Sequence, residues 1–119
     1  MANVLVVEDN PASLALAVLL LRSAGHTVLT ATDAEAGLAL ARTNRPDIIL
    51  MDIQLPGMDG VEATRLLKAD QATQGIPLIA LAMTGDEERI RAAGCDDYIA
   101  KPIRYQEFLA TIAKWLSPG

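Results

Sequence analysis

The chain has 119 residues, of which 51% are hydrophobic and 3% aromatic, and its formal net charge is −5. This length suits a single domain, residues 1–119, and the acidic balance argues against a nucleic-acid partner, which requires a basic surface. The longest apolar run, residues 14–21, is too short to span a membrane, and no basic leader precedes the first apolar segment. Since the chain also has only one cysteine, we expect a globular cytoplasmic domain.

Strand and helix patterns alternate five times along the chain. Short apolar segments rich in β-branched residues predict strands at 4–7, 26–32, 47–51, 77–81 and 97–100. Helix-start signals follow the first four strands, and they are Asn10 with Pro11, Asp33, Asp59 with Glu62, and Asp86. The last helix is indicated by apolar residues at near-helical spacing, namely Tyr105, Phe108, Leu109, Ile112 and Leu116.

This alternation predicts an α/β fold. Strands that alternate with helices imply right-handed crossovers and a mostly parallel sheet with helices on both faces. The strands are apolar along their whole length, as expected when both faces are buried. We therefore predict a doubly wound (βα)5 domain, in which sites form at the carboxyl ends of the strands.

Charged residues follow three of the predicted strands. Glu8 and Asp9 follow the first strand, Asp52 the third and Lys101 the fifth. These groups should meet at one edge of the sheet, where two like charges about 5 Å apart repel by roughly 3 kcal/mol at an effective dielectric near 20. Such a cluster requires a cation or protons, and its hard oxygen ligands favour Mg²⁺.

A carboxylate held beside Mg²⁺ and a lysine can attack a phosphoryl group and form an aspartyl phosphate. In this interpretation Asp52 is the nucleophile, Asp9 binds the metal and Glu8 acts through a water, while Lys101 holds the phosphate. Singly, Glu8 and Asp9 could be acids that favour a helix start, and Lys101 a solvated lysine. Their combination at three strand ends favours phosphoryl chemistry.

Three segments resemble the receiver domain of two-component response regulators. They are VLVVEDN (4–10), DIILMDIQLPGMDG (47–60) and AAGCDDYIAKP (92–102). The resemblance implies a flavodoxin-like fold with sheet order 2-1-3-4-5, and Mg²⁺ held by Asp9, Asp52 and the backbone carbonyl of Gln54. It also implies that a histidine kinase or a histidine phosphotransfer protein delivers a phosphoryl group to Asp52. Lys101-Pro102 would be a cis peptide, and Tyr98 would be the switch aromatic or else a partly buried core residue.

The segment PLIALAMTGDEE, 77–88, departs from the family pattern. The family usually ends its fourth strand with a Thr or Ser hydroxyl that binds the phosphoryl group, but this position is Ala82. The segment is also about three residues short of the usual spacing to Lys101. Thr84 could replace the hydroxyl, since it faces as Ala82 does and lies roughly 6.6 Å further along a strand. Alternatively, Ala82 holds the family position and Met83 occupies the place of a small residue; both alternatives stay open.

The leading hypothesis is a phosphoacceptor signalling domain, not an enzyme. We expect no effector domain, so the domain would act on a downstream protein or in a phosphate relay. The alternative is a pseudo-receiver, a constitutive protein-binding module whose switch is lost at Ala82. An aspartyl phosphatase is disfavoured because Gln54 stands where a second acid would be, and a flavin carrier because the first loop is acidic. In the first helix, Leu16 and Leu19 should point outward and are candidates for docking a partner.

Overall fold

The computed structural model describes residues 2–55, 57–83 and 85–116. Its strands are β1 (Asn3–Val7), β2 (Thr27–Ala31), β3 (Ile48–Asp52), β4 (Leu78–Ala82) and β5 (Asp97–Ala100). Its helices are α1 (Pro11–Ser23), α2 (Ala34–Asn44), α3 (Gly60–Ala69), α4 (Glu87–Ala93) and α5 (Tyr105–Leu116). Among the described residues, no helix is long and apolar enough to cross a membrane.

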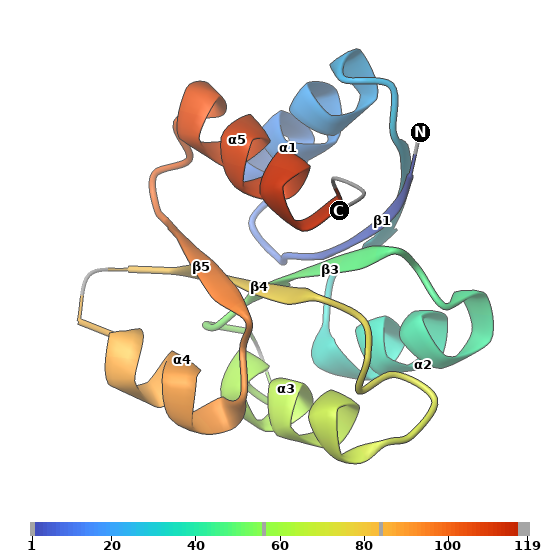
Figure 1. Ribbon diagram of the computed structural model, residues 1–119. Helices are drawn as coiled ribbons and strands as arrows, with labels where there is room; N and C mark the ends of the chain where they lie inside the picture. Colours follow the sequence, from blue (N-terminus) through green and yellow to red (C-terminus); the bar gives the residue numbers. More distant parts are fainter. Residues whose placement is uncertain (1, 56, 84, 117–119) are drawn as a thin grey trace.

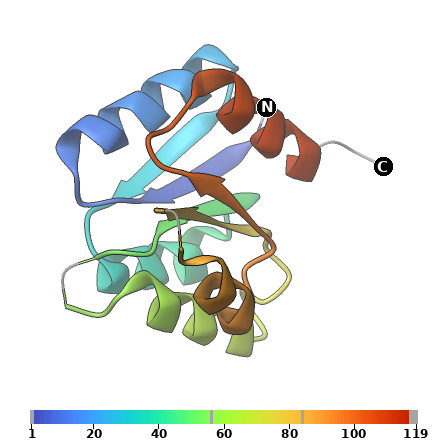
Figure 2. The ribbon, with the colours of Figure 1, turned by 90° about the vertical axis from the view of Figure 1, so that its left-hand side faces the viewer.

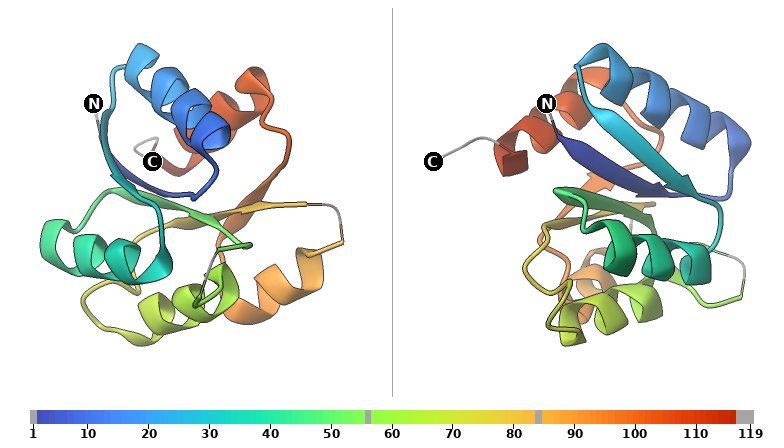
Figure 3. Two further views of the ribbon diagram at one scale, coloured as in Figure 1. Left: turned by 180° about the vertical axis from the view of Figure 1, so that it is seen from behind. Right: turned by 90° about the vertical axis from the view of Figure 1, so that its right-hand side faces the viewer.

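All strand pairs are parallel, and the sheet order is β2-β1-β3-β4-β5. Helices α1 and α5 cover one face of the sheet, and α2, α3 and α4 cover the other (Figures 1 and 2). Views from behind and from the side show the same three layers (Figure 3). The predicted doubly wound, flavodoxin-like fold with order 2-1-3-4-5 is confirmed.

The central strands hold the core together because they contribute side chains to both faces. Leu5 and Ile49 pack toward α2 and α3, whereas their neighbours Val4 and Ile48 pack toward α1 and α5. Every residue of β3 is buried, as the continuous apolar run predicted. Each fully buried aliphatic side chain contributes roughly 1.5–3 kcal/mol to folding, so this double coverage fixes the strand positions firmly.

A third, smaller cluster attaches α4 to the sheet. We call it the α4 cluster, and it consists of Ile53, Val61, Ala80, Ala82, Ile90 and Ala93. It joins the residue after β3, the first turn of α3, the end of β4 and one face of α4. Within this cluster, small or branched apolar side chains connect α4 with the residue after β3.

The helix caps expected for α1, α2 and α3 are present. Asn10 accepts hydrogen bonds from the backbone N–H groups of Ala12 and Ser13, and Asp33 and Asp59 cap α2 and α3 in the same way. Asp86 precedes α4 but makes no capping hydrogen bond. The caps satisfy N–H groups that have no partner within their helices, which explains why the helices begin where the sequence predicts.

Two strands are shifted by one residue from their predicted positions. β3 covers 48–52 and not 47–51, and β4 covers 78–82 and not 77–81. The reason is that the sheet ladder extends one residue further, so that Asp52 pairs with Leu81 and Ala82 pairs with Ala100. Asp52 is therefore the last residue of its strand, which fixes its backbone in the sheet.

The first residue of α3 lies directly against the end of β3. The backbone N–H of Gly60 donates to the carbonyl of Ile53 at 3.0 Å. A Cβ atom at Gly60 would overlap the carbonyl oxygen of Asp52 and lie 2.7 Å from Cα of Ile53. Because these are backbone atoms of a buried strand, they cannot move aside, and only glycine fits.

We expect Gly60→Ala to destabilise the protein by about 3 kcal/mol or more, because the new methyl group overlaps buried backbone. Gly75→Ala is the matched control, since a Cβ atom there meets nothing within 4 Å. The control should change the free energy of unfolding by about 0.5 kcal/mol or less. Urea denaturation of both variants tests this, and equal losses would show that the close approach at Gly60 is not the cause.

Candidate functional site

The predicted charged residues meet at the carboxyl edge of the sheet. Glu8 and Asp9 follow β1, Asp52 ends the adjacent strand β3, and Lys101 follows β5. One carboxylate oxygen from each of Glu8, Asp9 and Asp52 lies within 4.8 Å of the others. Glu8 and Asp52 are buried, with exposed fractions of 0% and 2%, whereas Asp9 is exposed. The cluster therefore has a buried floor and an open side.

Lys101 bridges the two buried carboxylates. Its Nζ lies 2.8 Å from Oε1 of Glu8 and 3.1 Å from Oδ2 of Asp52. Among the described residues Oε1 of Glu8 makes no aligned hydrogen bond, so its contact with Lys101 is an ion pair. The backbone N–H of Lys101 donates to the carbonyl of Ala82 at 2.9 Å, which fixes the backbone of Lys101 beside the end of β4.

Backbone N–H groups orient the remaining carboxylate oxygens. Gln54 donates to Oδ1 of Asp52 at 3.0 Å, and Asn10 donates to Oε2 of Glu8 at 3.3 Å. Asp52 thus presents one oxygen to an amide and the other to an ammonium group. These charge-assisted contacts hold the carboxylate in one orientation.

Burial and the neighbouring Glu8 raise the pKa of Asp52 to about 6, although Gln54 and Lys101 act in the opposite direction. Burial opposes the charge of Lys101, but its contacts with Glu8 and Asp52 outweigh burial and raise the pKa of the ammonium group. Lys101 is therefore a cation near neutral pH, and Asp52 is ionised above about pH 6.

The cluster is chemically suited to a divalent cation. With all groups ionised, three carboxylates and one ammonium leave a net charge of −2. Carboxylate oxygens are the hard ligands that Mg²⁺ prefers, and Oε1 of Glu8 is buried without an aligned hydrogen bond. Gln54, two residues after Asp52, is exposed.

The remaining predicted site residues lie around β4 and β5. Ala82 is buried at the end of β4, next to Ala100 of β5, and Thr84 is outside the described residues. Tyr98 on β5 is 43% exposed, so its interpretation as a core residue is wrong. The Lys101-Pro102 peptide bond is cis, as the resemblance implied.

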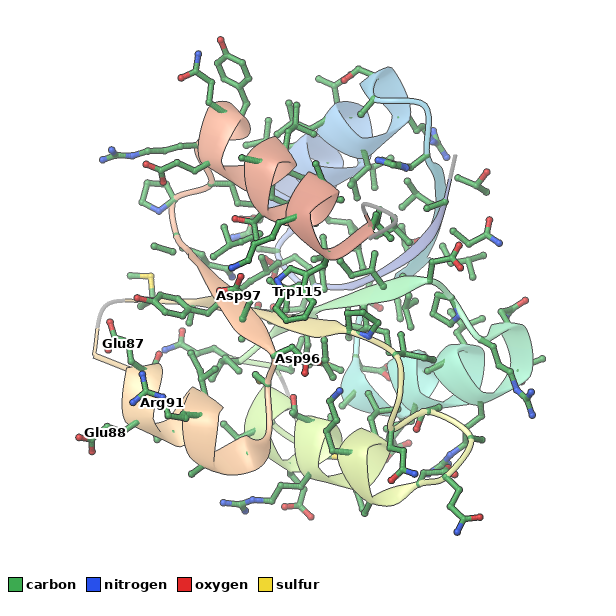
Figure 4. All side chains as sticks on the ribbon, viewed as in Figure 1. Glu87, Glu88, Arg91, Asp96, Asp97 and Trp115 are labelled. Atoms are coloured by element: carbon green, nitrogen blue, oxygen red, sulfur yellow. The ribbon has the colours of Figure 1, made fainter. Side chains whose placement is uncertain are left out.

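Sequence reasoning missed three contacts between elements, two at this edge of the sheet and one at the opposite edge, where β5 begins. It assigned Glu8 a contact through water, but not its direct ion pair with Lys101. It also missed the ion pair between Arg89 of α4 and Asp59 of α3. On β5, Asp97 accepts a hydrogen bond of 2.8 Å from Nε1 of Trp115 in α5 (Figure 4). The spacing of these residues along the chain does not indicate that they are in contact.

A doubly wound sheet with an acidic cluster and a lysine at its carboxyl edge is the arrangement implied by the resemblance to receiver domains. The chain matches the family described as the response regulator receiver domain over residues 4–113. The chain therefore belongs to this family of two-component signalling domains.

Individual relatives agree with this assignment. The chain is 45% identical to the polar-differentiation response regulator DivK of Brucella anthropi over 117 residues, which cover 96% of this chain and 95% of DivK. The receiver domain of the sensor histidine kinase PA1611 from Pseudomonas aeruginosa is 36% identical with a TM-score of 0.91, and 98% of each chain is covered. That structure has a magnesium ion coordinated in its active-site cleft. The chemotaxis response regulator CheY4 of Vibrio cholerae is 29% identical with a TM-score of 0.91, over 98% of this chain and 99% of CheY4.

The raised pKa of Asp52 makes folding stability depend on pH. A carboxyl group with a raised pKa stabilises the folded state at pH values below about 4, and this stabilisation is lost as the pH rises through about 6. Asp52→Asn removes the charge, so without divalent cations the variant should be more stable than the wild type at pH 7.5. A shift of about two units corresponds to roughly 3 kcal/mol as an upper value.

Denaturation at pH 4 and pH 7.5 in the presence of a chelator checks this expectation. The advantage of Asp52→Asn should shrink toward pH 4, where the wild-type carboxyl group is neutral in the folded protein. Glu107→Gln, which alters an exposed carboxylate on α5, is the control. If Asp52→Asn is no more stable than the wild type at pH 7.5, burial of this carboxylate does not oppose its charge.

Proposed function

We propose that this receiver domain accepts a phosphoryl group on Asp52 from a histidine kinase or a histidine phosphotransfer protein, with Mg²⁺ as its cofactor. The observation that carries the proposal is the position of Lys101, which is ion-paired with both Glu8 and Asp52 at the carboxyl edge. A buried carboxylate fixed beside an ammonium group is prepared to meet a phosphoryl group, whose negative charge the lysine attracts.

In the transfer step, an oxygen of Asp52 attacks the phosphorus atom of the donor's phosphohistidine. The P–O bond to Asp52 forms as the P–N bond breaks, and the electron pair of that bond stays on the imidazole nitrogen, which takes up a proton. Asp52 must be ionised to attack, a condition met above about pH 6. Gln54 holds Oδ1 in place, and Lys101 stabilises the negative charge on the transferred group.

Asp9, Asp52 and the carbonyl of Gln54 would hold Mg²⁺, with Glu8 acting through a water as well as through Lys101. When bound, the metal would supply positive charge beside the oxygens of the phosphoryl group. Support comes from the cluster of three carboxylates and from the magnesium ion in the receiver domain of PA1611. Asp9 is the exposed member of the cluster and therefore the one most accessible to an entering ion.

The phosphorylated domain would act in the cytoplasm as a signalling domain, through contact with a downstream protein or through phosphate relay. Leu16 and Leu19 of α1 are 38% and 65% exposed, as predicted, which supports docking of the phosphodonor along this helix. The second candidate function is a pseudo-receiver that binds a protein constitutively. Ala82 favours it, because a methyl group at the end of β4 cannot bind a phosphoryl oxygen.

Asp9→Asn is expected to weaken Mg²⁺ binding by at least about tenfold, because it removes a charged ligand. Isothermal titration calorimetry measures the affinity at pH 7.5. Asp33→Asn is the matched control, since it loses one exposed negative charge but keeps an oxygen that can cap α2. Equal weakening in both variants would mean that Asp9 acts only through long-range charge.

Incubation with acetyl phosphate and Mg²⁺ should add the mass of one phosphoryl group to the wild type. Asp52→Asn should gain none, and Lys101→Met should react about 100-fold more slowly because the stabilising ammonium group is lost. Intact mass spectrometry measures the adduct. A wild type that binds Mg²⁺ but forms no adduct would replace this proposal with the pseudo-receiver.

A further inference from the structure

The missing hydroxyl at Ala82 raises the question of how α4 could respond to phosphorylation. The α4 cluster provides one physical connection, since it contains Ile53, which follows Asp52, and Ile90 of α4. Val61 in the first turn of α3 belongs to the same cluster. The first turn of α3 therefore lies between the candidate phosphorylation site and α4.

A charged contact joins the same two helices at the surface. Nη2 of Arg89 in α4 lies 3.7 Å from Oδ2 of Asp59, and Nη1 lies 3.4 Å from Oδ1 of Asp86. Arg89 thus divides its guanidinium group between the residue that caps α3 and the residue that precedes its own helix. Asp86 makes no capping hydrogen bond, so its carboxylate is available to Arg89.

Asp59 is next in the chain to Gly60, which contacts the backbone of Asp52 and Ile53. Oδ1 of Asp59 caps α3 by accepting the N–H of Glu62 at 2.9 Å. The next residue, Gly60, packs against the carbonyl of Asp52 and donates to the carbonyl of Ile53. A displacement of the loop after Asp52 would therefore move Asp59, which is the ion-pair partner of Arg89.

We propose that Arg89 is a positioning residue that transmits phosphorylation of Asp52 to α4 by shifting its ion pairing from Asp86 toward Asp59. This inference rests on the proposed function. The phosphate group of the aspartyl phosphate carries about −1.5 to −2 charges in place of the single charge of ionised Asp52, so the negative charge at the end of β3 increases and with it the attraction for a cation on the α3 side. Exposed ion pairs contribute little to stability, so the two pairings are close in free energy and a modest change in potential redistributes them.

Because Arg89 is in the first turns of α4, its shift pulls the start of this short helix toward α3. The movement needs no hydroxyl group on β4. It uses instead the contact between Gly60 and Asp52 and the ion pair between Arg89 and Asp59. The signal then passes to α4 from the α3 side of the site.

The test compares amide spectra of ¹⁵N-labelled proteins before and during phosphorylation with acetyl phosphate and Mg²⁺. In the wild type, the amides of residues 87–93 should shift. In Arg89→Gln and in Asp59→Asn these shifts should fall by at least half, while the phosphoryl adduct still forms. Asp59→Asn is informative because asparagine caps a helix as well as aspartate does, so α3 keeps its cap and only the charge is lost.

Arg91→Gln is the matched control. Arg91 is on the same helix beside a pocket of about 180 Å³ between α4 and β5, and it forms no ion pair among the described residues (Figure 4). This variant should keep the wild-type shifts. If Arg89→Gln and Asp59→Asn also keep them, or if Arg91→Gln loses them equally, the proposed role of Arg89 is overturned.

The same experiment separates failure of this inference from failure of the proposed function. If the adduct forms in the wild type and in all three variants, and the α4 amides of the variants shift as much as those of the wild type, Arg89 has no part in the mechanism. Asp52 would still be the phosphoacceptor. No adduct in the wild type would overturn both. Thermal unfolding of each variant shows whether a loss of shifts comes from a loss of folding.

Discussion

The ion pairs of Lys101 with Glu8 and Asp52 are the interaction on which the site depends. Two carboxylates that are almost completely buried are costly unless a cation lies beside them. Lys101 reaches them from β5, across the end of β4, so the ends of β1, β3 and β5 must be held in fixed register. Double coverage of the sheet by helices supplies that rigidity, and the hydrogen bond from Lys101 to the carbonyl of Ala82 places the lysine.

The same constraint explains the raised pKa of Asp52. One ammonium group offsets only part of the charge of three carboxylates, and burial opposes what remains. A divalent cation that entered the site would offset this charge and lower the free energy of the site. The proposed reactivity of Asp52 and the local instability then have one origin, namely the buried negative charge.

Much of this arrangement could be predicted from the sequence, because parallel strands leave a signature in their apolar runs. Those runs located all five strands, and the residues that follow them located Glu8, Asp9, Asp52 and Lys101. The contacts between elements could not be predicted in this way. Gly60 lies against Asp52, and Arg89 pairs with Asp59, because of how the helices pack on the sheet. The identity of a glycine or an arginine in the sequence does not indicate which residue it will contact.

The segment 77–88, which is short by the family pattern, would affect the output of the domain rather than its chemistry. The charged groups of the site stand at the ends of β1, β3 and β5, which the sheet fixes, and none of them comes from the segment after β4. Loss of residues between β4 and α4 can therefore leave phosphoryl chemistry intact. What the loss would alter is the connection to α4, which we propose to run through the first turn of α3, next to the α4 cluster. On this proposal, a receiver domain keeps its charged site while its response to phosphorylation takes a different route.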